Sequence, residues 1–188
     1  MRHSVRLEGF RYALRPIREA DARFVAALRS DPDLGAYLHR TSGRVEDQEA
    51  WLATYFDRAG DYYFIVETLE GAEPVGTVGL YDSDGRAAEW GRWLIAKDAP
   101  AAVESALLVY RAAFEAVGLD EVFCRTVAEN AKVVSFHDSS GAHRVGTLAR
   151  HFRLDGVEHD AVEHRVDRSR WDMMRPKLEF LARRLAQH

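Results

Sequence analysis

The sequence predicts an α+β fold with a mixed sheet. Three strand-like runs follow one another in the middle of the chain with only short turns between them, which is typical of a meander of hairpins. Helical patterns stand before and after this group, so helices are expected to flank the sheet. With 188 residues the chain is long enough for one core and short for two, so we expect a single domain over 1–188, with a core at 10–167 and a helical tail at 168–188.

The N-terminal part is expected to hold one strand and two helices. The run "RYALRPI" (11–17) is a short strand candidate. Apolar Phe24 and Leu28 then recur at helical spacing, and Pro32 ends that helix. The segment "VEDQEAWLATYFDRAG" (45–60) predicts a second helix.

The meander consists of "YYFIVETL" (62–69), "PVGTVGLYD" (74–82) and "AAEWGRWLI" (87–95). Each run is rich in β-branched and aromatic residues. The connections "EGAE" and "SDGR" have the composition of tight turns, so consecutive strands are expected to pair antiparallel.

The clearest helix is predicted over 100–118. Pro100 is suited to the first turn, and Gly118 is suited to the end. Between them an apolar stripe runs at helical spacing through Val103, Leu107, Tyr110 and Phe114.

The C-terminal third alternates strands and helices. We expect a strand at 121–128, a short helix at 130–141 and strands at 144–154 and 159–166. The tail after them has apolar residues at helical spacing, and Pro176 marks a kink or a restart in it. This tail either covers the sheet or forms a homodimer interface, and its pattern fits both.

Composition narrows the function classes. The formal net charge is −4 with both signs mixed along the chain, which does not suit nucleic acid. No apolar run reaches the roughly 20 residues of a membrane span, and the start lacks the apolar stretch of a signal peptide, so we expect a cytoplasmic protein. The single cysteine, Cys124, lies in a strand pattern and is expected to be a structural thiol.

Three segments, in this order and spacing, resemble the GNAT acetyltransferase superfamily. They are "LRPIREADARFVAALRSDP", the pair "PVGTVGLYD" and "AEWGRWLI", and "NAKVVSFHDSSGA", and together they cover residues 10 to about 155. Within the superfamily they look closest to the branch of ribosomal-protein alanine and amino-sugar acetyltransferases. The resemblance implies a mostly antiparallel central sheet with an added C-terminal helix, acetyl-CoA as cosubstrate, and a primary amine as acceptor.

The resemblance places the pyrophosphate of the cofactor at the loop "AKDAPAA". Family members usually have glycines there, whereas this chain has Pro100 and alanines. The N–H groups of Ala101 and Ala102 still suit an anion at a helix N-terminus, and Lys97 adds a cation. Asp98 is a plausible N-cap that would repel the same phosphate. We therefore expect fewer pyrophosphate contacts than in glycine-loop relatives.

The pantetheine arm is expected to pair with the end of the preceding strand as an added strand would. The positions that match the family are Trp93, Leu94, Ile95 and Ala96. Asn130 matches the family asparagine that hydrogen-bonds this arm, and it also suits a helix N-cap. We expect Phe136 beside the cofactor as well.

His137 is the candidate general acid. It lies seven residues after Asn130, where many family members have a tyrosine acid. Since the ordinary pKa of His is about 6.5 and that of a thiol about 8.5, an imidazolium there would protonate the leaving sulfur readily. The alternative is a satisfied histidine beside Asp138.

Glu89 is the candidate base that accepts the ammonium proton. Strand alternation puts Glu89, Gly91, Trp93 and Ile95 on one face, and Gly91 would let a substrate approach closely. A solvated strand glutamate is the competing interpretation.

For the acceptor amine we expect His39 and Tyr81 to face the cleft. The pair His159 and His164 invites a metal site, but their odd spacing puts them on opposite faces of a strand, so no metal is expected.

The sequence thus predicts an acetyl-CoA-dependent N-acetyltransferase acting by direct transfer on a small-molecule amine, an amino sugar or an amino-acid-like metabolite. Two alternatives stay open. One is a protein N-terminal acetyltransferase of the ribosomal-protein type, and the other is a non-catalytic CoA-binding module of the same fold.

Overall fold

One mixed sheet organises the molecule. A computed structural model describes residues 1–187, and in this range eight strands pair in the order β1-β2-β3-β4-β5-β6-β8-β7. Every neighbouring pair is antiparallel except β5 and β6. The α+β class with a mixed, mostly antiparallel sheet, flanking helices and a C-terminal helix is confirmed.

The elements follow the predicted order closely. The strands are β1 (Leu7–Glu8), β2 (Tyr12–Pro16), β3 (Tyr62–Thr68), β4 (Pro74–Tyr81), β5 (Ala87–Ile95), β6 (Glu121–Val127), β7 (His143–Leu154) and β8 (Val157–Asp167). The helices are α1 (Ala22–Ser30), α2 (Val45–Tyr55), α3 (Ala102–Arg111), α4 (Ala131–Ser140) and α5 (Arg168–Leu185), with a 3-10 turn at Glu19–Asp21 and a π-helical turn at Ala112–Val117. The two-residue strand β1 is absent from the sequence-based expectation because it is too short to show alternation.

Two helix ends differ from the prediction. The second helix ends at Tyr55 rather than at residue 60. The long helix begins at Ala102 rather than at Pro100, and it passes into the π-helical turn before Gly118 ends it in the left-handed conformation, with φ 84°. A left-handed residue at a helix end favours glycine, so the predicted stop at Gly118 is confirmed.

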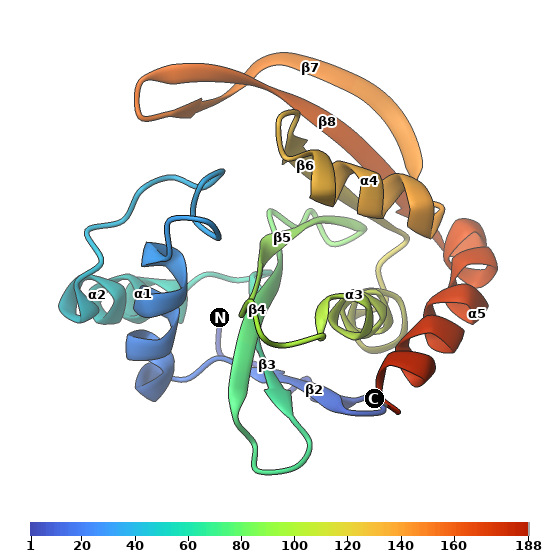
Figure 1. Ribbon diagram of the computed structural model, residues 1–188, viewed down its shortest axis with the longest axis horizontal. Coiled ribbons are helices and arrows are strands. Elements are labelled where there is room, and N and C mark those ends of the chain that lie inside the picture. Colours follow the sequence, from blue (N-terminus) through green and yellow to red (C-terminus); the bar gives the residue numbers. More distant parts are fainter. Residues whose placement is uncertain (188) are drawn as a thin grey trace.

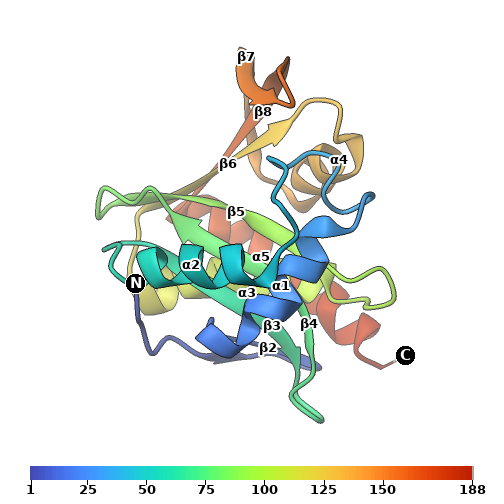
Figure 2. The same cartoon turned by 90° about the vertical axis from the view of Figure 1, so that its left-hand side faces the viewer.

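The helices cover both faces of the β2–β5 half of the sheet. Figure 1 shows α1 and α2 on one side of these strands and α3 on the other, and Figure 2 shows α1 and α2 from their own side. The larger core lies between the sheet, α3 and α5, and includes Tyr110 and Trp171. A smaller core under α1 and α2 is built around Val25, Leu52 and Tyr55, all fully buried. Each such side chain contributes roughly 1.5–3 kcal/mol on burial.

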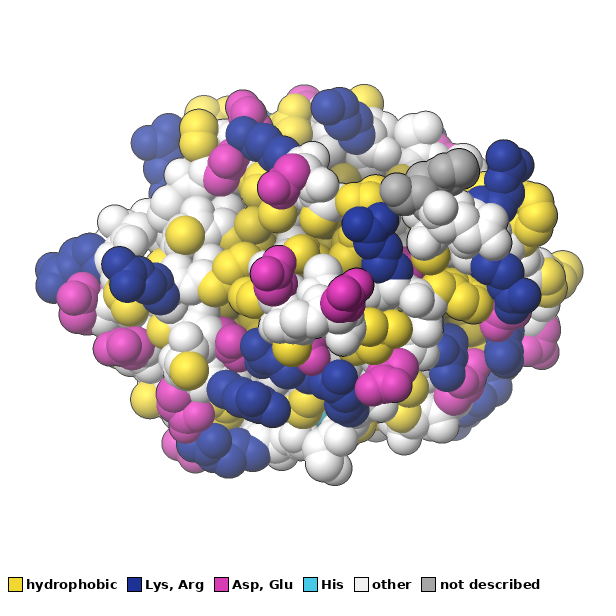
Figure 3. All heavy atoms as spheres, turned by 60° about the horizontal axis from the view of Figure 1, so that its bottom comes forward, with side chains coloured by type: hydrophobic (Ala, Val, Ile, Leu, Met, Phe, Trp, Pro, Cys, Tyr) yellow, Lys and Arg dark blue, Asp and Glu magenta, His cyan; other side chains and the backbone are white. Residues whose placement is uncertain are grey.

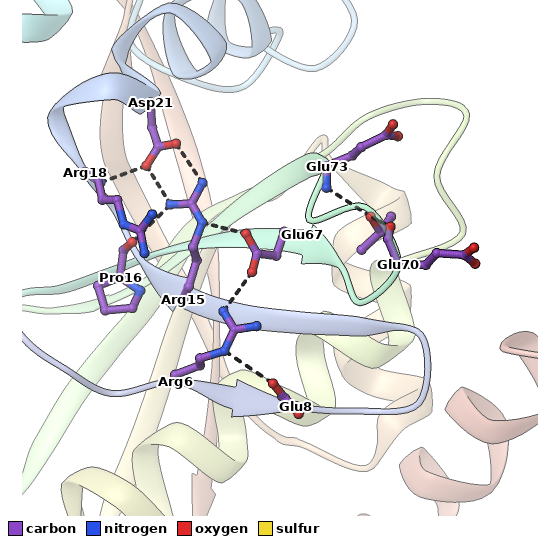
Figure 4. Close-up of polar contacts among 10 residues, drawn as sticks. Arg6, Glu8, Arg15, Pro16, Arg18, Asp21, Glu67, Glu70 and Glu73 are labelled. Carbon is purple, nitrogen blue, oxygen red and sulfur yellow. Dashed lines mark hydrogen bonds and ion pairs between the residues drawn. The ribbon is translucent and has the colours of Figure 1, made fainter.

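Buried ion pairs fix the start of α1 against the sheet. Arg15 on β2, 8% exposed, donates from Nε to Glu67 on β3 at 2.6 Å. Its two terminal nitrogens donate to the Asp21 carboxylate at 2.7 and 2.8 Å (Figure 4). Asp21 also accepts the backbone N–H of Arg18, and Arg6 donates to the other Glu67 oxygen. The fork geometry of arginine thus joins two strands to the turn that starts the first helix.

Glu104 fixes α3 to the start of β2 through hydrogen bonds to the backbone. Its Oε1 accepts the backbone N–H groups of Phe10, Arg11 and Tyr12, which form the turn into β2. Gly9 stands beside this carboxylate, and a Cβ there would lie 2.1 Å from Oε1. Glycine at this position is therefore a packing requirement.

Strands β5 and β6 diverge after a short stretch of parallel pairing. Their pairing covers only Ala87–Glu89 against Glu121–Phe123. Strand β6 continues along β8 as far as Val127, whereas β5 from Trp90 onward pairs only with β4. The backbone edge of β5 that faces β6 is consequently unpaired over its second half.

The C-terminal tail is a single helix. It starts at an Asp167 N-cap, whose carboxylate accepts the Arg170 N–H at 2.8 Å, and it does not restart at Pro176. Residue 188 of the predicted tail lies outside the described residues. On the outer side of α5, Met173 and Phe180 are exposed. Figure 3 shows hydrophobic side chains gathered near the middle of one face of the molecule, with charged side chains around them.

Within residues 1–187, no helix is long and apolar enough to cross a membrane.

Candidate active site

A cleft of about 270 Å³ opens where β5 and β6 diverge. Seven of the residues singled out from the sequence line it together: His39, Tyr81, Glu89, Trp93, Leu94, Asn130 and His137. The other six lie outside its lining: Ile95, Ala96, Lys97, Ala101, Ala102 and Phe136. The divergence therefore brings residues from distant parts of the chain to one place.

A β-bulge in β5 decides which residues share a face. Between the pairs Gly79–Gly91 and Thr77–Leu94, the single residue Val78 opposes both Arg92 and Trp93. Arg92 has φ 51°, which is rare for a residue with a side chain. The Thr77 hydroxyl donates to the Arg92 carbonyl at 2.8 Å and holds this conformation.

The bulge corrects the predicted alternation. Trp93 was expected on the same face as Glu89. Instead its Nε1 donates to Ser105 on α3 at 2.9 Å, and its ring contacts Trp90, with 5.3 Å between centroids. Trp90 and Glu89 are adjacent in the strand and point to opposite faces. The extra residue at Arg92 thus moves Trp93 to the α3 face and away from Glu89.

Glu89 is a buried carboxyl at the edge of the cleft, 8% exposed. Burial raises its pKa to about 7, while the nearby Arg125 guanidinium, which donates to Glu89 at 3.3 Å, limits the rise. A carboxyl with a pKa near neutral pH is suited to accept and release a proton during turnover.

Arg125 is a site residue that the sequence analysis missed. It lines the cleft and donates from Nε to Glu163 at 3.0 Å in addition to its contact with Glu89. A charged residue in the middle of the apolar strand "EVFCRTV" was the available signal.

His137 is buried among aromatic rings, 2% exposed. Ring centroids of Trp90 and Phe136 lie 4.9 and 5.8 Å from its own. Burial, followed by the neighbouring His164, lowers its pKa to about 3. The imidazole is therefore neutral at physiological pH, and the predicted imidazolium form is corrected because the charge of Asp138 offsets only part of the effect of burial.

Gly91 has a different role from the expected one. A Cβ at this position would lie 2.1 Å from the Tyr81 hydroxyl, so the missing side chain makes room for the phenol rather than for a substrate. The Tyr81 ring also lies under the Arg92 guanidinium, 4.3 Å from the ring centroid. Burial raises the pKa of Tyr81, so the phenol stays protonated.

The first backbone N–H groups of α3 have no side-chain cap. The N-cap residue is Ala101, fully buried, and the predicted Asp98 cap is wrong because Asp98 lies three residues before it. The Lys97 ammonium pairs with Asp31 at 3.0 Å and Asp33 at 2.6 Å, so it ties this loop to the segment after α1. The N-terminal end of α3 keeps the positive dipole that favours an anion.

Asn130 is the N-cap of α4. Its side chain accepts the Val133 N–H at 3.5 Å, and the residue lines the cleft at the same time. Phe136 on the same helix contacts the Trp93 ring across the divergence, with 5.0 Å between centroids. The two sides of the opening are thus joined by an aromatic contact.

One side of the cleft is basic. His39 and Tyr81 line it as predicted, and Arg29 and Arg92 line it as well. The Arg92 guanidinium forms two hydrogen bonds to Asp61, at 2.5 and 2.9 Å. Neither arginine carries a pattern in the sequence that distinguishes it from a surface residue.

Comparisons with known proteins agree with this geometry. A family model for the acetyltransferase (GNAT) domain matches residues 11–143. No curated protein sequence matches the chain. Among solved structures, apo FdhC, a nucleotide-linked sugar GNAT, is 29% identical with a TM-score of 0.79, over 96% of this chain and 98% of that one.

Two more distant structures share the fold. A GCN5-related N-acetyltransferase from Brucella melitensis is 18% identical with a TM-score of 0.82, over 96% of this chain and 86% of that one. The spermidine N-acetyltransferase from Vibrio cholerae, solved with CoA and spermine, is 20% identical with a TM-score of 0.76, over 85% of this chain and 97% of that one. Since the family model covers well over half of the residues, the chain belongs to the GNAT acetyltransferase family and is an acyltransferase.

Proposed function

We propose that this protein transfers the acetyl group of acetyl-CoA directly to a primary amine of a small molecule. The observation that carries the proposal is Glu89, a carboxyl with a pKa of about 7 placed where β5 and β6 diverge. Amine acetylation needs a neutral amine, and a base of this pKa takes the ammonium proton at physiological pH.

The residues around the divergence fit the cosubstrate. The edge of β5 that β6 leaves unpaired, at Leu94 and Ile95, offers backbone groups to the amides of the pantetheine arm, as an added strand would. The predicted contribution of Ala96 is limited, because its N–H already donates to the Val75 carbonyl at 2.8 Å. Asn130 adds a carboxamide from the opposite side. The uncapped start of α3 at Ala101 and Ala102 suits the pyrophosphate.

When bound, acetyl-CoA supplies the thioester whose acetyl group is transferred. The chain's part is to hold the acceptor beside it and to move a proton. Glu89 in its carboxylate form accepts a proton from the amine and becomes a neutral carboxylic acid. The Arg125 guanidinium stabilises the carboxylate form only partly, so Glu89 stays basic enough to act.

His137 is proposed as a neutral hydrogen-bond donor toward the sulfur side of the cleft. Its pKa of about 3 excludes a charged ring at pH 7, but a neutral imidazole still carries one N–H. Cys124 Sγ lies 3.9 Å from its Nδ1, and which of the two ring nitrogens carries the proton depends on the tautomer.

For the acceptor we favour an amino sugar over a protein N-terminus. The support is the likeness to the nucleotide-linked sugar GNAT at 29% identity over nearly the whole of both chains. An amino-acid-like metabolite is the second small-molecule candidate.

A two-step experiment tests the proposal. Calorimetry with acetyl-CoA should show binding, and absence of binding at about 1 mM, the upper end of common KM values, would contradict it. A thiol-release assay over amino sugars, amino acids, N-terminal peptides and spermidine then identifies the acceptor class. Binding without transfer to any amine would favour a non-catalytic module.

A further inference from the structure

A second cavity, of about 420 Å³, lies beside the cleft between α1, α2 and the sheet. Its cationic lining residues are Arg29 from α1, Arg44 before α2 and Arg92 from β5. Hydroxyl groups of Thr41 and Ser42 line it too. None of these positions belongs to the residues predicted from the sequence.

The charge of this lining is positive. Three guanidinium groups face one carboxylate, that of Asp47, which accepts the Ser42 hydroxyl. Arg92 is neutralised by Asp61, whereas Arg29 donates only to a backbone carbonyl, that of His39 at 3.2 Å. Arg44 has only a long, exposed contact of 3.5 Å with Glu46. Two guanidinium groups therefore keep donors for a ligand.

Gln48 adds a neutral polar side chain to the cavity. It lines the same cavity from α2 and is only 9% exposed. A carboxamide that lines the cavity beside arginines can both donate and accept hydrogen bonds, which suits a polar ligand.

The cavity and the cleft share Arg29 and Arg92 as lining residues, so they are neighbouring compartments. We propose that the arginine cavity binds a phosphate group of the acceptor, while the acceptor's amine lies in the cleft near Glu89; this rests on the proposed transfer to an amine. The cavity offers more hydrogen-bond donors than a single carboxylate ligand would use. The planar set of N–H donors on an arginine side chain also matches the geometry of phosphate oxygens.

The same charge disfavours a polyamine acceptor. Arginines that attract phosphate repel a polycation in the adjoining cleft. The substrate class inferred for this chain therefore differs from spermidine, the acceptor in the name of the Vibrio cholerae structure.

The test is calorimetry of the full chain with three probes: inorganic pyrophosphate, succinate and spermidine. We expect pyrophosphate to bind and spermidine not to bind. Succinate binding as tightly as pyrophosphate would overturn the phosphate assignment, and so would spermidine binding more tightly than pyrophosphate.

Variants locate the binding. Arg44→Gln is exposed and should fold, and it should weaken pyrophosphate binding by about 5- to 20-fold, as expected for one lost charge-assisted hydrogen bond. Arg23→Gln is the matched control, because Arg23 is exposed on α1 and lines neither cavity. Equal binding by the two variants would overturn the location.

The two proposals fail separately. Acetyl transfer to amines without pyrophosphate binding would leave the transferase proposal standing and overturn the phosphate site. Pyrophosphate binding without transfer to any amine would do the reverse.

Discussion

The two faces of β5 differ in polarity, although the residues that form them are adjacent in the sequence. On the α3 face, Trp90 and Trp93 pack with His137 into an aromatic wall. On the face toward α1 and α2, Glu89 and Arg92 stand among ion pairs. The bulge at Arg92 separates the two sets, so one strand gives the cleft an apolar side and a charged side.

The comparison shows how burial affects an acid and a base differently. Desolvation favours the neutral form of both Glu89 and His137, which raises the pKa of Glu89 to about 7 and lowers that of His137 to about 3. The charge of Arg125 limits the pKa shift of Glu89, and the charge of Asp138 offsets only part of the larger pKa shift of His137. The charged face therefore holds a group that titrates near neutral pH, and the aromatic face holds one that stays neutral.

The largest expected effect comes from removing the base. Glu89→Gln should lower kcat/KM by about 10²- to 10⁴-fold, since an amide accepts no proton. A steady-state thiol-release assay measures it, with Glu158→Gln at the exposed start of β8 as control. Full activity of Glu89→Gln with unchanged folding would assign the base elsewhere.

The pH profile sharpens the role of the charged face. Activity should rise with pH through about 7 as Glu89 loses its proton. Arg125→Gln removes the cation that lowers this pKa, so the rise should move to higher pH. Arg165→Gln serves as control because Arg165 contacts Glu163 and Glu121 but not Glu89. Identical pH profiles for both variants would show that Arg125 does not affect the pKa that controls activity.

Acid should lower the free energy of unfolding through His137 on the aromatic face. The pKa of His137 is lower in the folded chain than in the unfolded one. The contribution of its neutral ring to the free energy of unfolding is therefore complete above about pH 6.5 and is lost as pH falls toward 3. The slope is about 1.4 kcal/mol per pH unit within this window. Urea unfolding at pH 7 and pH 5 should show a smaller loss for His137→Asn than for the native chain.

A second readout covers the case in which this variant does not fold. In the native chain, the His137 ring protons observed by NMR should not titrate between pH 5 and 8. Titration near 6.5 would contradict the aromatic burial.

The smallest effect concerns the boundary between the faces. Thr77→Val removes the hydrogen bond to the Arg92 carbonyl and should cost about 1 kcal/mol of unfolding free energy. Thr147→Val on exposed β7 is the control. A cost no larger than that of the control would show that the bulge is held by other contacts, such as the Arg92–Asp61 pair.

Much of this site was accessible from the sequence. The motif beginning at Asn130 led to His137, and the central hairpin led to Glu89, and the structure places all three at one cleft. Arg125 and the arginine cavity were not predicted, because a single charged residue in a strand or loop has no periodic signature. The alternation argument failed at Trp93 because a bulge depends on the register with β4.

What the sequence determined by itself is the order of elements and the fold class, because these follow from local apolar periodicity and turn composition. It also carried the family resemblance, which rests on the residues of three segments and their order. The tertiary structure decided which side chains share a face and which of them are charged. Both depend on long-range packing: the bulge exists only against β4, and the pKa values of Glu89 and His137 depend on neighbours supplied by distant strands and helices.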